Sequence, residues 1–341
     1  MTFTARAVAG VRPRSRWSAV WAVAAVLLAL PVAVLSVFRA VPVEWPTLAV
    51  QLLSFTPWLL IPAGAAVLLA IPGRRRFLIW VTAALAAAQV FWLLPLDHGR
   101  SITEAGAPAA KLTAMTINSE FGQAEAAGIV RLVRENGVGL LTVQEHSRAL
   151  EDRLAAAGLS GLLPYRISSP TDDGGGSAIY SAHRLEAVGV LPDTPFHMPI
   201  VRLTVEGAGA PAVLEVTNVH ALPPVDVRVD QWRSDLAALA RLSVRPGNRL
   251  LIGDFNATYD HAEFRALLDV GPDGRKMVDV GTAAGLRLEP TWPMEGHRLP
   301  GIAIDHLVTS PGIAASGYAV HRVPGTDHAA VLATLSLPTG R

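Results

Sequence analysis

Three long apolar stretches occupy the first third of the chain, and none of them contains a charged residue. They run from Trp17 to Phe38, from Trp45 to Ile71 and from Phe77 to Leu96. A helix rises about 1.5 Å per residue and the hydrocarbon core of a bilayer is about 30 Å thick, so each stretch is long enough to cross it. We therefore expect a membrane domain over residues 1–96, with three transmembrane helices over about 17–38, 47–71 and 77–96.

Arginines indicate which ends of these helices face the cytoplasm. Four arginines precede the first stretch and three separate the second from the third, whereas the loop after the first stretch carries only Arg39, against Glu44. Cationic loops stay on the cytoplasmic side, so the N-terminus is predicted inside and everything after about residue 97 outside the cell. A cleaved signal peptide is the alternative for the first stretch, but its apolar part is too long and two more stretches follow.

From residue 112 the pattern changes to short apolar stretches between polar segments. Val138–Val143 is almost continuously apolar, as in a strand buried on both faces, and Ala124–Arg134 has apolar residues at helical spacing. Strands are expected over 112–117, 138–143, 176–181, 198–205, 212–219, 249–253, 302–308, 316–321 and 329–336, and helices over 124–134, 149–157, 227–242 and 261–268. Many strands with few helices fit one α/β domain over 112–341, and the small, Gly- and Pro-containing segment 97–111 is expected to be a linker.

The charges are divided unevenly between these two parts. The chain has 29 Lys/Arg and 28 Asp/Glu, but residues 1–111 hold ten basic against three acidic residues and residues 112–341 nineteen against twenty-five. The net charge of +1 is thus the sum of +7 and −6, which excludes a uniformly basic nucleic-acid coat protein. There is no cysteine, so disulfides, zinc–thiolate sites and thiol catalysis are excluded.

Acids, amides and histidines stand where the expected strands begin or end, and loops at strand ends are where sites are built on α/β scaffolds. Each such residue alone has a structural alternative, as a turn former or a buried, satisfied side chain, so the prediction rests on their joint occurrence. The candidates are Asn118, Glu145, His220, Asp254, Asn256, Asp305, Asp327 and His328.

These residue types suit phosphoryl chemistry. In Asp254-Phe255-Asn256 the carboxylate and the amide share a face of extended chain, so one can orient a water while the other donates to a phosphate oxygen. The unperturbed pKa of a histidine, about 6.5, suits His328 as a general base near neutral pH, and Asp305 would orient its ring. Carboxylates and amides without thiols favour Mg²⁺ or Mn²⁺ over zinc.

Other polar and aromatic residues are given structural roles. Gly174–Gly176 is not followed by Lys-Ser/Thr, so no phosphate-binding P-loop is expected. His306 should pack on the opposite face of the strand from Asp305, and Trp232 and Trp292 are expected to pack in the core rather than line a substrate pocket. The remaining histidines lack metal-like spacing and are expected at the surface or in loops: His146, His183, His197, His261, His297 and His321.

The order of these short motifs resembles the endonuclease/exonuclease/phosphatase superfamily, over almost all of 112–341. The motifs are Asn118, Val143-Gln144-Glu145, Gly175-Gly176-Ser177-Ala178-Ile179-Tyr180-Ser181, Asn218-Val219-His220, Gly253-Asp254-Phe255-Asn256, Ile304-Asp305-His306 and Thr326-Asp327-His328. The resemblance implies a four-layer αββα sandwich of two mixed β-sheets flanked by helices, and metal-dependent cleavage of a phosphoester. With three spans ahead of the domain, the architecture also resembles actinobacterial teicoplanin-resistance membrane proteins of the VanJ type.

The resemblance also implies roles for individual residues. Glu145 is similar to the principal Mg²⁺ or Mn²⁺ ligand of the family, with Asn118 and Asp327 supporting the metal directly or through water. His328, oriented by Asp305, resembles the base that activates the attacking water. Asp254 and Asn256 would position that water and the phosphate, and His220 would donate to the phosphate oxygens or toward the leaving group. Ala303 stands before Ile304-Asp305 where many relatives carry a cation, which puts an extra phosphate contact there in doubt.

Three hypotheses for the function follow. A nuclease should present a basic surface to its polyanionic substrate, and the −6 charge of residues 112–341 argues against one. We therefore favour a membrane-anchored, extracytoplasmic phosphatase or phosphodiesterase that acts on a lipid-linked or small phosphoester of the cell envelope. An extracellular, membrane-tethered nuclease is the second hypothesis, so nucleic acid is a less favoured partner than the lipid bilayer. A non-catalytic binding or sensor domain in antibiotic response is the third.

Overall fold

The computed structural model of the protein describes residues 16–94, 110–207, 211–296 and 299–338. The described residues form two compact units. The first comprises residues 16–40 and 56–94, and the second comprises residues 41–55 together with the described residues from 110 onward. Most of the expected linker, 97–109, lies outside the described residues, and its last two residues belong to the first strand of the second unit.

The first unit consists of helices α1 (Arg16–Ala40), α3 (Leu60–Gly73) and α4 (Arg76–Leu93), with a 3₁₀ turn η1 (Thr56–Leu59) leading into α3. Three of its segments are long and apolar enough to cross a membrane: Arg16–Ala40, Thr56–Gly73 and Arg76–Leu93. Small buried residues let the helices approach closely. They are Ala22, Ala25 and Ala29 on α1, and Ala63, Ala66 and Ala70 on α3. The Gln89 side-chain amide also donates to the Ser36 hydroxyl at 2.8 Å, which links α4 to α1.

The second apolar stretch is divided between the two units. Residues Thr47–Leu53 form a short separate helix, α2, and the apolar segment of membrane-spanning length begins only at Thr56. Pro57 explains the break, because it has no backbone N–H to donate to the Leu53 carbonyl, whereas a proline is tolerated in the first turn of a helix. The helix expected over 47–71 is therefore replaced by α2 in the second unit and by Thr56–Gly73 in the first.

The second unit contains two six-stranded sheets. The strand order of the first is β11-β12-β1-β2-β4-β3 and that of the second is β5-β6-β7-β8-β10-β9. Each sheet is mixed, since β1 and β2 run parallel in one and β7 and β8 in the other, whereas the other paired strands are antiparallel. The first sheet has β1 (Ala110–Asn118), β2 (Leu140–Gln144), β3 (Tyr165–Ser169), β4 (Ser177–Ser181), β11 (Ala314–Arg322) and β12 (Ala329–Leu337). The second has β5 (Leu185–Val190), β6 (Pro199–Val205), β7 (Ala212–His220), β8 (Asn248–Asp254), β9 (Val278–Asp279) and β10 (Asp305–Thr309).

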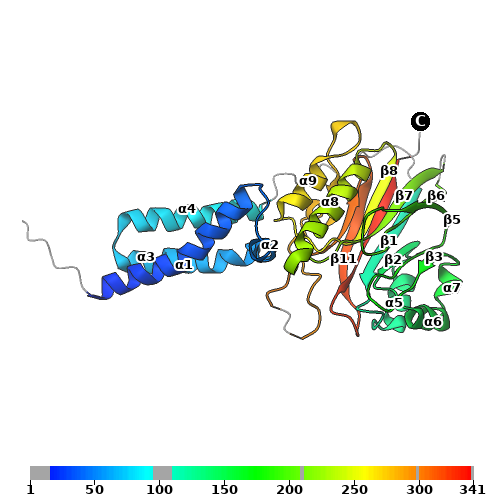
Figure 1. Cartoon of the computed structure of the whole chain (residues 1–341), viewed down its shortest axis with the longest axis horizontal. Helices are drawn as coiled ribbons and strands as arrows, with labels where there is room; N and C mark the ends of the chain where they lie inside the picture. The colour runs from blue at the N-terminus through cyan, green and yellow to red at the C-terminus, as the bar shows by residue number, and fades with distance from the viewer. Residues whose placement is uncertain (1–15, 95–109, 208–210, 297–298, 339–341) are drawn as a thin grey trace, which may run out of the picture. The chain divides into compact units, whose positions relative to one another are not determined.

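Helices cover the outer face of each sheet, as Figure 1 shows. The first sheet packs against α5 (Ala126–Glu135), α6 (Arg148–Ala156) and α7 (Leu159–Leu162), and the second against α8 (Val229–Ser243) and α9 (Ala262–Asp269). Three shorter helical segments complete the unit: η2 (Asp226–Arg228), η3 (Pro272–Gly274) and α10 (Val280–Ala283).

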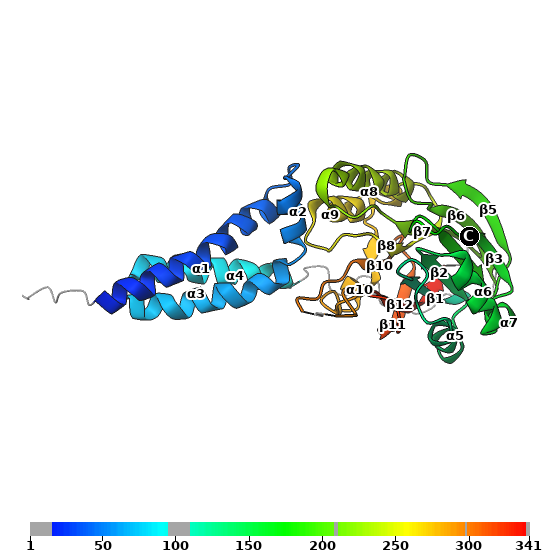
Figure 2. The same cartoon turned by 60° about the horizontal axis from the view of Figure 1, so that its bottom comes forward.

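Alternation along the strands separates three apolar clusters. In β1, for example, Leu112 and Ala114 face the cluster between the sheets, whereas Met115 and Ile117 face the helices. Two mixed sheets flanked by helices are what the sequence predicts, and this prediction is confirmed. Figure 2 shows the same layers from a second direction.

The topology brings many strand ends to one edge. The carboxyl ends of the parallel pairs β1–β2 and β7–β8 lie there, with Asn118 opposite Gln144 and His220 opposite Asp254. Because β10 runs antiparallel to β8, its first residue Asp305 pairs with Asp254. The start of β12, which runs antiparallel to β1, lies at this edge as well.

Two buried amides join the sheets beneath this edge. The Gln144 amide donates to the Asn218 side-chain oxygen and to the Thr116 hydroxyl. The Asn218 amide in turn donates to the Val143 and Ala178 carbonyls at 3.1 and 3.0 Å and to the Ser177 hydroxyl at 2.6 Å. Gln144 and Asn218 are fully buried, so neither side chain could be satisfied by water if its partner were lost.

Replacing Asn218 by alanine should destabilise the protein strongly. N218A leaves several buried polar groups without partners, at a cost of about 3 kcal/mol, or a fall in Tm of roughly 6–12 °C. N248A is the matched control, because the Asn248 amide donates to the Val213 and Pro338 carbonyls at an exposed position. Thermal unfolding of the full chain in detergent measures both, and equal falls in Tm would contradict the structural role given to Asn218.

Candidate active site

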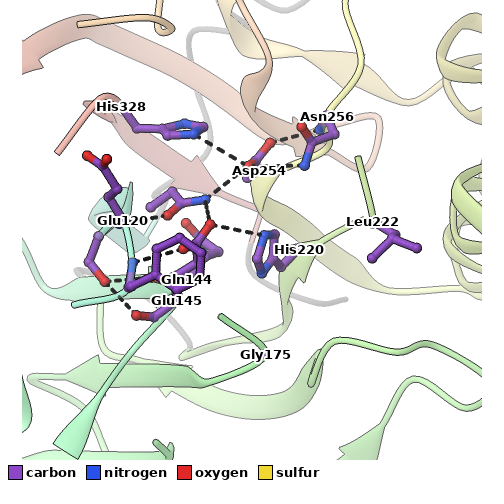
Figure 3. A network of polar contacts seen from close by, with 12 residues as sticks. Glu120, Gln144, Glu145, Gly175, His220, Leu222, Asp254, Asn256 and His328 are labelled. Atoms are coloured by element: carbon purple, nitrogen blue, oxygen red, sulfur yellow. Dashed lines mark hydrogen bonds and ion pairs between the residues drawn. The ribbon is translucent and has the colours of Figure 1, made fainter. Parts of the chain in front are cut away.

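All eight site residues expected from the sequence lie in one connected set of contacts at this edge. The contacts run from His220 through Glu145 and Asn118 to Asp254, and from Asp254 to Asn256 and His328. His328 continues the set to Asp305 and Asp327. Figure 3 shows the side chains of both sheets pointing toward one another.

The Asn118 amide holds two carboxylates side by side. Its nitrogen donates to Glu145 Oε1 at 3.0 Å and to Asp254 Oδ2 at 3.1 Å, while its oxygen accepts from the backbone N–H of Glu120 at 3.1 Å. The second oxygen of Glu145 accepts from the backbone N–H of Phe121 at 2.8 Å. The Glu145 side chain remains 17% exposed, so its outer lone pairs are accessible from solvent.

The ring of His328 is fixed by Asp305. Its Nδ1 donates to Asp305 Oδ2 at 3.0 Å, whereas its Nε2 faces Asp254 Oδ2 at 3.8 Å and Asp327 Oδ1 at 3.9 Å. Burial alone would lower the pKa of His328, but the carboxylates of Asp305 and Asp254 outweigh burial and raise it to about 10. Without a further positive charge, the imidazole therefore carries a proton at neutral pH.

Burial has the opposite effect on Asp254. It raises the pKa of this carboxyl, against the effect of the His328 imidazolium. Hydrogen bonds from the Asn256 backbone N–H at 2.8 Å and from Asn118 also favour the ionised form. Asp254 and His328 thus form a buried ion pair, with 3.8 Å between Oδ2 and Nε2.

Asp327 is held by two groups from distant parts of the chain. The Trp292 indole N–H donates to Asp327 Oδ2 at 2.8 Å, and the Glu120 carboxylate accepts from the backbone N–H of Asp327 at 2.8 Å. Trp292 was expected to pack in the core, but it is only partly buried and orients a site carboxylate.

His220 is a neutral member of the set. Burial, with a smaller contribution from the positive charge on His328, lowers its pKa to about 3. Its Nε2 lies 3.8 Å from Glu145 Oε1, and the ring of Phe196 stacks on it with 4.2 Å between centroids. A neutral imidazole fixed in this way can donate a hydrogen bond without adding charge.

The backbone is strained where these side chains are presented. Glu145 and Asn256, which follow β2 and β8, have φ values of 52° and 46°, in the left-handed region that non-glycine residues rarely adopt. Such strain is common at functional sites, where surrounding contacts fix it. Gly253, just before Asp254, leaves no room for a side chain, since a Cβ would lie 2.1 Å from the Val219 carbonyl oxygen.

Comparison with known families decides the classification. A family model described as "Endonuclease/Exonuclease/phosphatase family" matches residues 115–328, more than half of the chain. The chain belongs to the endonuclease/exonuclease/phosphatase family. A search of curated protein sequences gives no match.

Solved structures of similar fold agree with this assignment. TDP2 of D. rerio, crystallised with a single-strand DNA product, is 17% identical, with a TM-score of 0.51 over 66% of this chain and 98% of that one. A functionally unknown conserved protein of Enterococcus faecalis V583 is 15% identical, with a TM-score of 0.51 over 67% of this chain and 100% of that one. At these identities the likeness shows the fold alone.

Members of the endonuclease/exonuclease/phosphatase family are typically dependent on divalent metals, and the donor set here fits a hard cation. Two groupings are available. Asp254, Asp305 and His328 each offer a ligand atom, and these atoms lie within 4.8 Å of one another, but the three residues are buried and Asp305 already binds His328. Glu145 and Asp327 are 17% and 33% exposed, so their carboxylates can be reached from solvent.

Glu120 was not among the residues expected at the site. Burial and the negative charge of Asp327 raise the pKa of its carboxyl, which accepts from the Asp327 backbone N–H. The sequence could have indicated Glu120. In Asn118-Ser119-Glu120 an acid and an amide are two residues apart just after a strand, as they are in Asp254-Phe255-Asn256.

Two histidines expected at the surface or in loops lie in loops but are fully buried. His146 packs against the Tyr180 hydroxyl at 3.2 Å, and burial lowers its pKa to about 4. His261 lies in the core under α8. His297 lies outside the described residues.

Replacing Asp305 by asparagine should move the pH dependence of any hydrolytic activity. Asp305 stabilises the protonated His328, so D305N lowers the pKa of His328 and shifts the acidic limb of kcat/KM to lower pH. The maximal kcat should fall at least ~100-fold, because the ring loses the carboxylate that orients it. D152N, at an exposed position on α6, is the control. An acidic limb that stays in place or moves to higher pH would show that Asp305 does not act on the base.

Proposed function

We propose that the protein is a membrane-anchored, metal-dependent phosphoesterase whose catalytic domain lies outside the cytoplasm. The observation that carries this proposal is the contact set in which Asp305 fixes the imidazole of His328 while its Nε2 faces the carboxylates of Asp254 and Asp327 at 3.8 and 3.9 Å. This arrangement suits proton transfer from a water that attacks phosphorus. The family supports the metal-dependent phosphoesterase activity, and the three apolar helices support the membrane anchor.

Glu145 would be the principal ligand of a divalent cation, with Asp327 and Glu120 beside it. Asn118 would support the metal by holding the Glu145 carboxylate in place. When bound, Mg²⁺ or Mn²⁺ would stabilise charge on the phosphoryl oxygens and lower the pKa of His328 by electrostatic repulsion.

Each of the remaining site residues has its own role in the reaction. Asp254 and Asn256 orient the water and the phosphate, and unprotonated His328 takes a proton through Nε2 as the water oxygen bonds to phosphorus. Asp305 holds the ring and stabilises the imidazolium that forms. His220, which is neutral, donates a hydrogen bond toward a phosphate or leaving-group oxygen as the ester P–O bond breaks.

Lipid-linked or small phosphoesters are the favoured substrates. The sequence from 112 onward has six more acidic than basic residues, which opposes the binding of a long polyanion. A domain anchored in a bilayer also meets lipid phosphates at high local concentration. The nuclease alternative is supported by the similar fold of D. rerio TDP2, which was crystallised with a single-strand DNA product.

Phosphoesterase activity should depend on the metal and on the buried side chains of Asp254 and His328. The full chain in detergent should hydrolyse bis(4-nitrophenyl) phosphate or 4-nitrophenyl phosphate with Mg²⁺, and lose this activity on chelation. D254A and H328A should each lower kcat at least ~100-fold, the contribution of a general acid or base. H183A is the matched control, because His183 lies in a loop after β4 and outside the contact set.

Two results would contradict parts of this proposal. Unchanged turnover in both D254A and H328A would reject the site. If single-stranded DNA is degraded rapidly while polyprenyl pyrophosphate and phospholipids remain intact, the protein is a nuclease rather than a lipid phosphoesterase.

The membrane topology can be tested by cysteine labelling, because the natural chain contains no cysteine. In intact cells, a membrane-impermeant maleimide should label E44C, in the loop after α1, and D152C, on α6. R75C, between α3 and α4, should be labelled only after lysis, since arginine-rich loops stay inside. Labelling of R75C but not D152C in intact cells would contradict an extracytoplasmic catalytic domain.

A further inference from the structure

Residues 41–55 connect two apolar helices along the chain, yet they belong to the unit that carries the candidate active site. We call these residues the docking segment. Its helix α2 lies beside α8 and α9 in both Figure 1 and Figure 2.

One face of α2 completes the apolar core under α8 and α9. Ala49, Val50 and Leu53 are 2–5% exposed, whereas Leu48 and Leu52 on the other side are 66% and 40% exposed. Val50 is part of the buried cluster that contains residues of α8, α9 and β8, and Trp45 packs against the same cluster. Removing the segment would uncover this apolar surface.

A fully buried histidine binds the docking segment. His261 Nδ1 accepts from the backbone N–H of Thr258 at 2.9 Å, which requires the ring proton on Nε2. That Nε2 lies 2.9 Å from the Val50 carbonyl oxygen and donates to it. One ring therefore joins α2 to the loop that follows Asp254 and Asn256.

The same ring contacts a side chain that reaches the catalytic motif. Trp232 packs edge-on against His261, with 5.2 Å between the ring centroids. The Trp232 indole N–H donates to the backbone carbonyl of Phe255 at 3.2 Å, between Asp254 and Asn256.

Polar contacts fix the start of the segment. The Thr47 hydroxyl donates to the Asp226 carbonyl at 2.8 Å, and the Arg233 guanidinium donates to the Trp45 carbonyl. The contacts thus extend from residue 45 to residue 53 and involve both backbone and side chains.

We propose that the docking segment is an integral part of the catalytic domain and that His261 uses it to position the loop carrying Asp254 and Asn256. The candidate active site is then fully formed only when residues 41–55 are in place. The segment and the domain must also lie on the same side of the membrane. The role in catalysis and the membrane crossing rest on the proposed function, whereas the docking itself does not.

Cross-linking in membranes tests the docking directly. T47C/D226C should form a cross-link with a short bismaleimide or mild oxidant in the full chain, because Thr47 touches the backbone of residue 226. T47C/D152C is the control, since α6 covers the other sheet, and it should not cross-link. V50D should abolish the T47C/D226C product. Absence of this product in otherwise native membranes would overturn the proposal.

Two substitutions of His261 separate the positioning role from simple stability. Asparagine can replace the acceptor at Nδ1 and glutamine the donor at Nε2. H261Q should keep the T47C/D226C cross-link but lower kcat at least ~10-fold with little change in KM, since the loop is no longer held from Thr258. H261N should weaken the cross-link and also lower kcat, because the loop is then no longer tied to the Val50 carbonyl. Equal kcat in H261Q and the wild type would overturn the positioning role.

These results are distinguishable from failure of the proposed function. If the wild-type chain hydrolyses no phosphoester but T47C/D226C cross-links, the docking stands and the enzymatic assignment fails. If the wild type is active and T47C/D226C does not cross-link, only the docking proposal is rejected.

Discussion

The hydrogen bond from Gln144 to Asn218, together with those from Asn218 to the other sheet, joins the two sheets beneath the edge where the site is built, and the rest of the site depends on this junction. Gln144 ends β2, and the next residue is Glu145. Asn218 is two residues before His220 on β7. Because both amides are buried and fully used, the two strand ends have one fixed spacing, and Asn118 can bridge Glu145 of one sheet and Asp254 of the other. A small shift between the sheets would break this bridge.

Negative charge is concentrated at the edge above this junction. The carboxylates of Asp254, Asp305 and Asp327 lie around His328. Two more carboxylates belong to the same site: Glu145 contacts Asn118, and Glu120 accepts from the Asp327 backbone. Such an excess of negative charge favours a divalent cation, and three of these carboxylates, Asp305, Asp254 and Asp327, raise the pKa of His328 against the effect of burial. In the proposed mechanism the carboxylates therefore both attract the metal ion and keep His328 protonated. Binding of the metal ion then offsets their charge and favours release of the His328 proton.

The sequence predicted these residues because polar side chains directly follow apolar stretches at Asn118, Glu145 and Asp254, and because the family resemblance groups them in one site. The strand directions that bring them to one edge come from the structure. Trp292, Glu120 and His261 were missed or given other roles, because their functions depend on contacts between distant segments. The packing of α2 on the catalytic domain could not be predicted either, since an apolar helix that packs on a domain has the same composition as one that crosses a bilayer. The resemblance to VanJ-type proteins stays a prediction.

The position of the cation tests the central claim most directly. Anomalous diffraction from crystals of the full chain grown with Mn²⁺ would locate it independently of activity. The account predicts one peak in contact with the Glu145 carboxylate, on the side of Asp327. A peak enclosed by Asp254, Asp305 and His328, or no peak at Glu145 at saturating Mn²⁺, would contradict it.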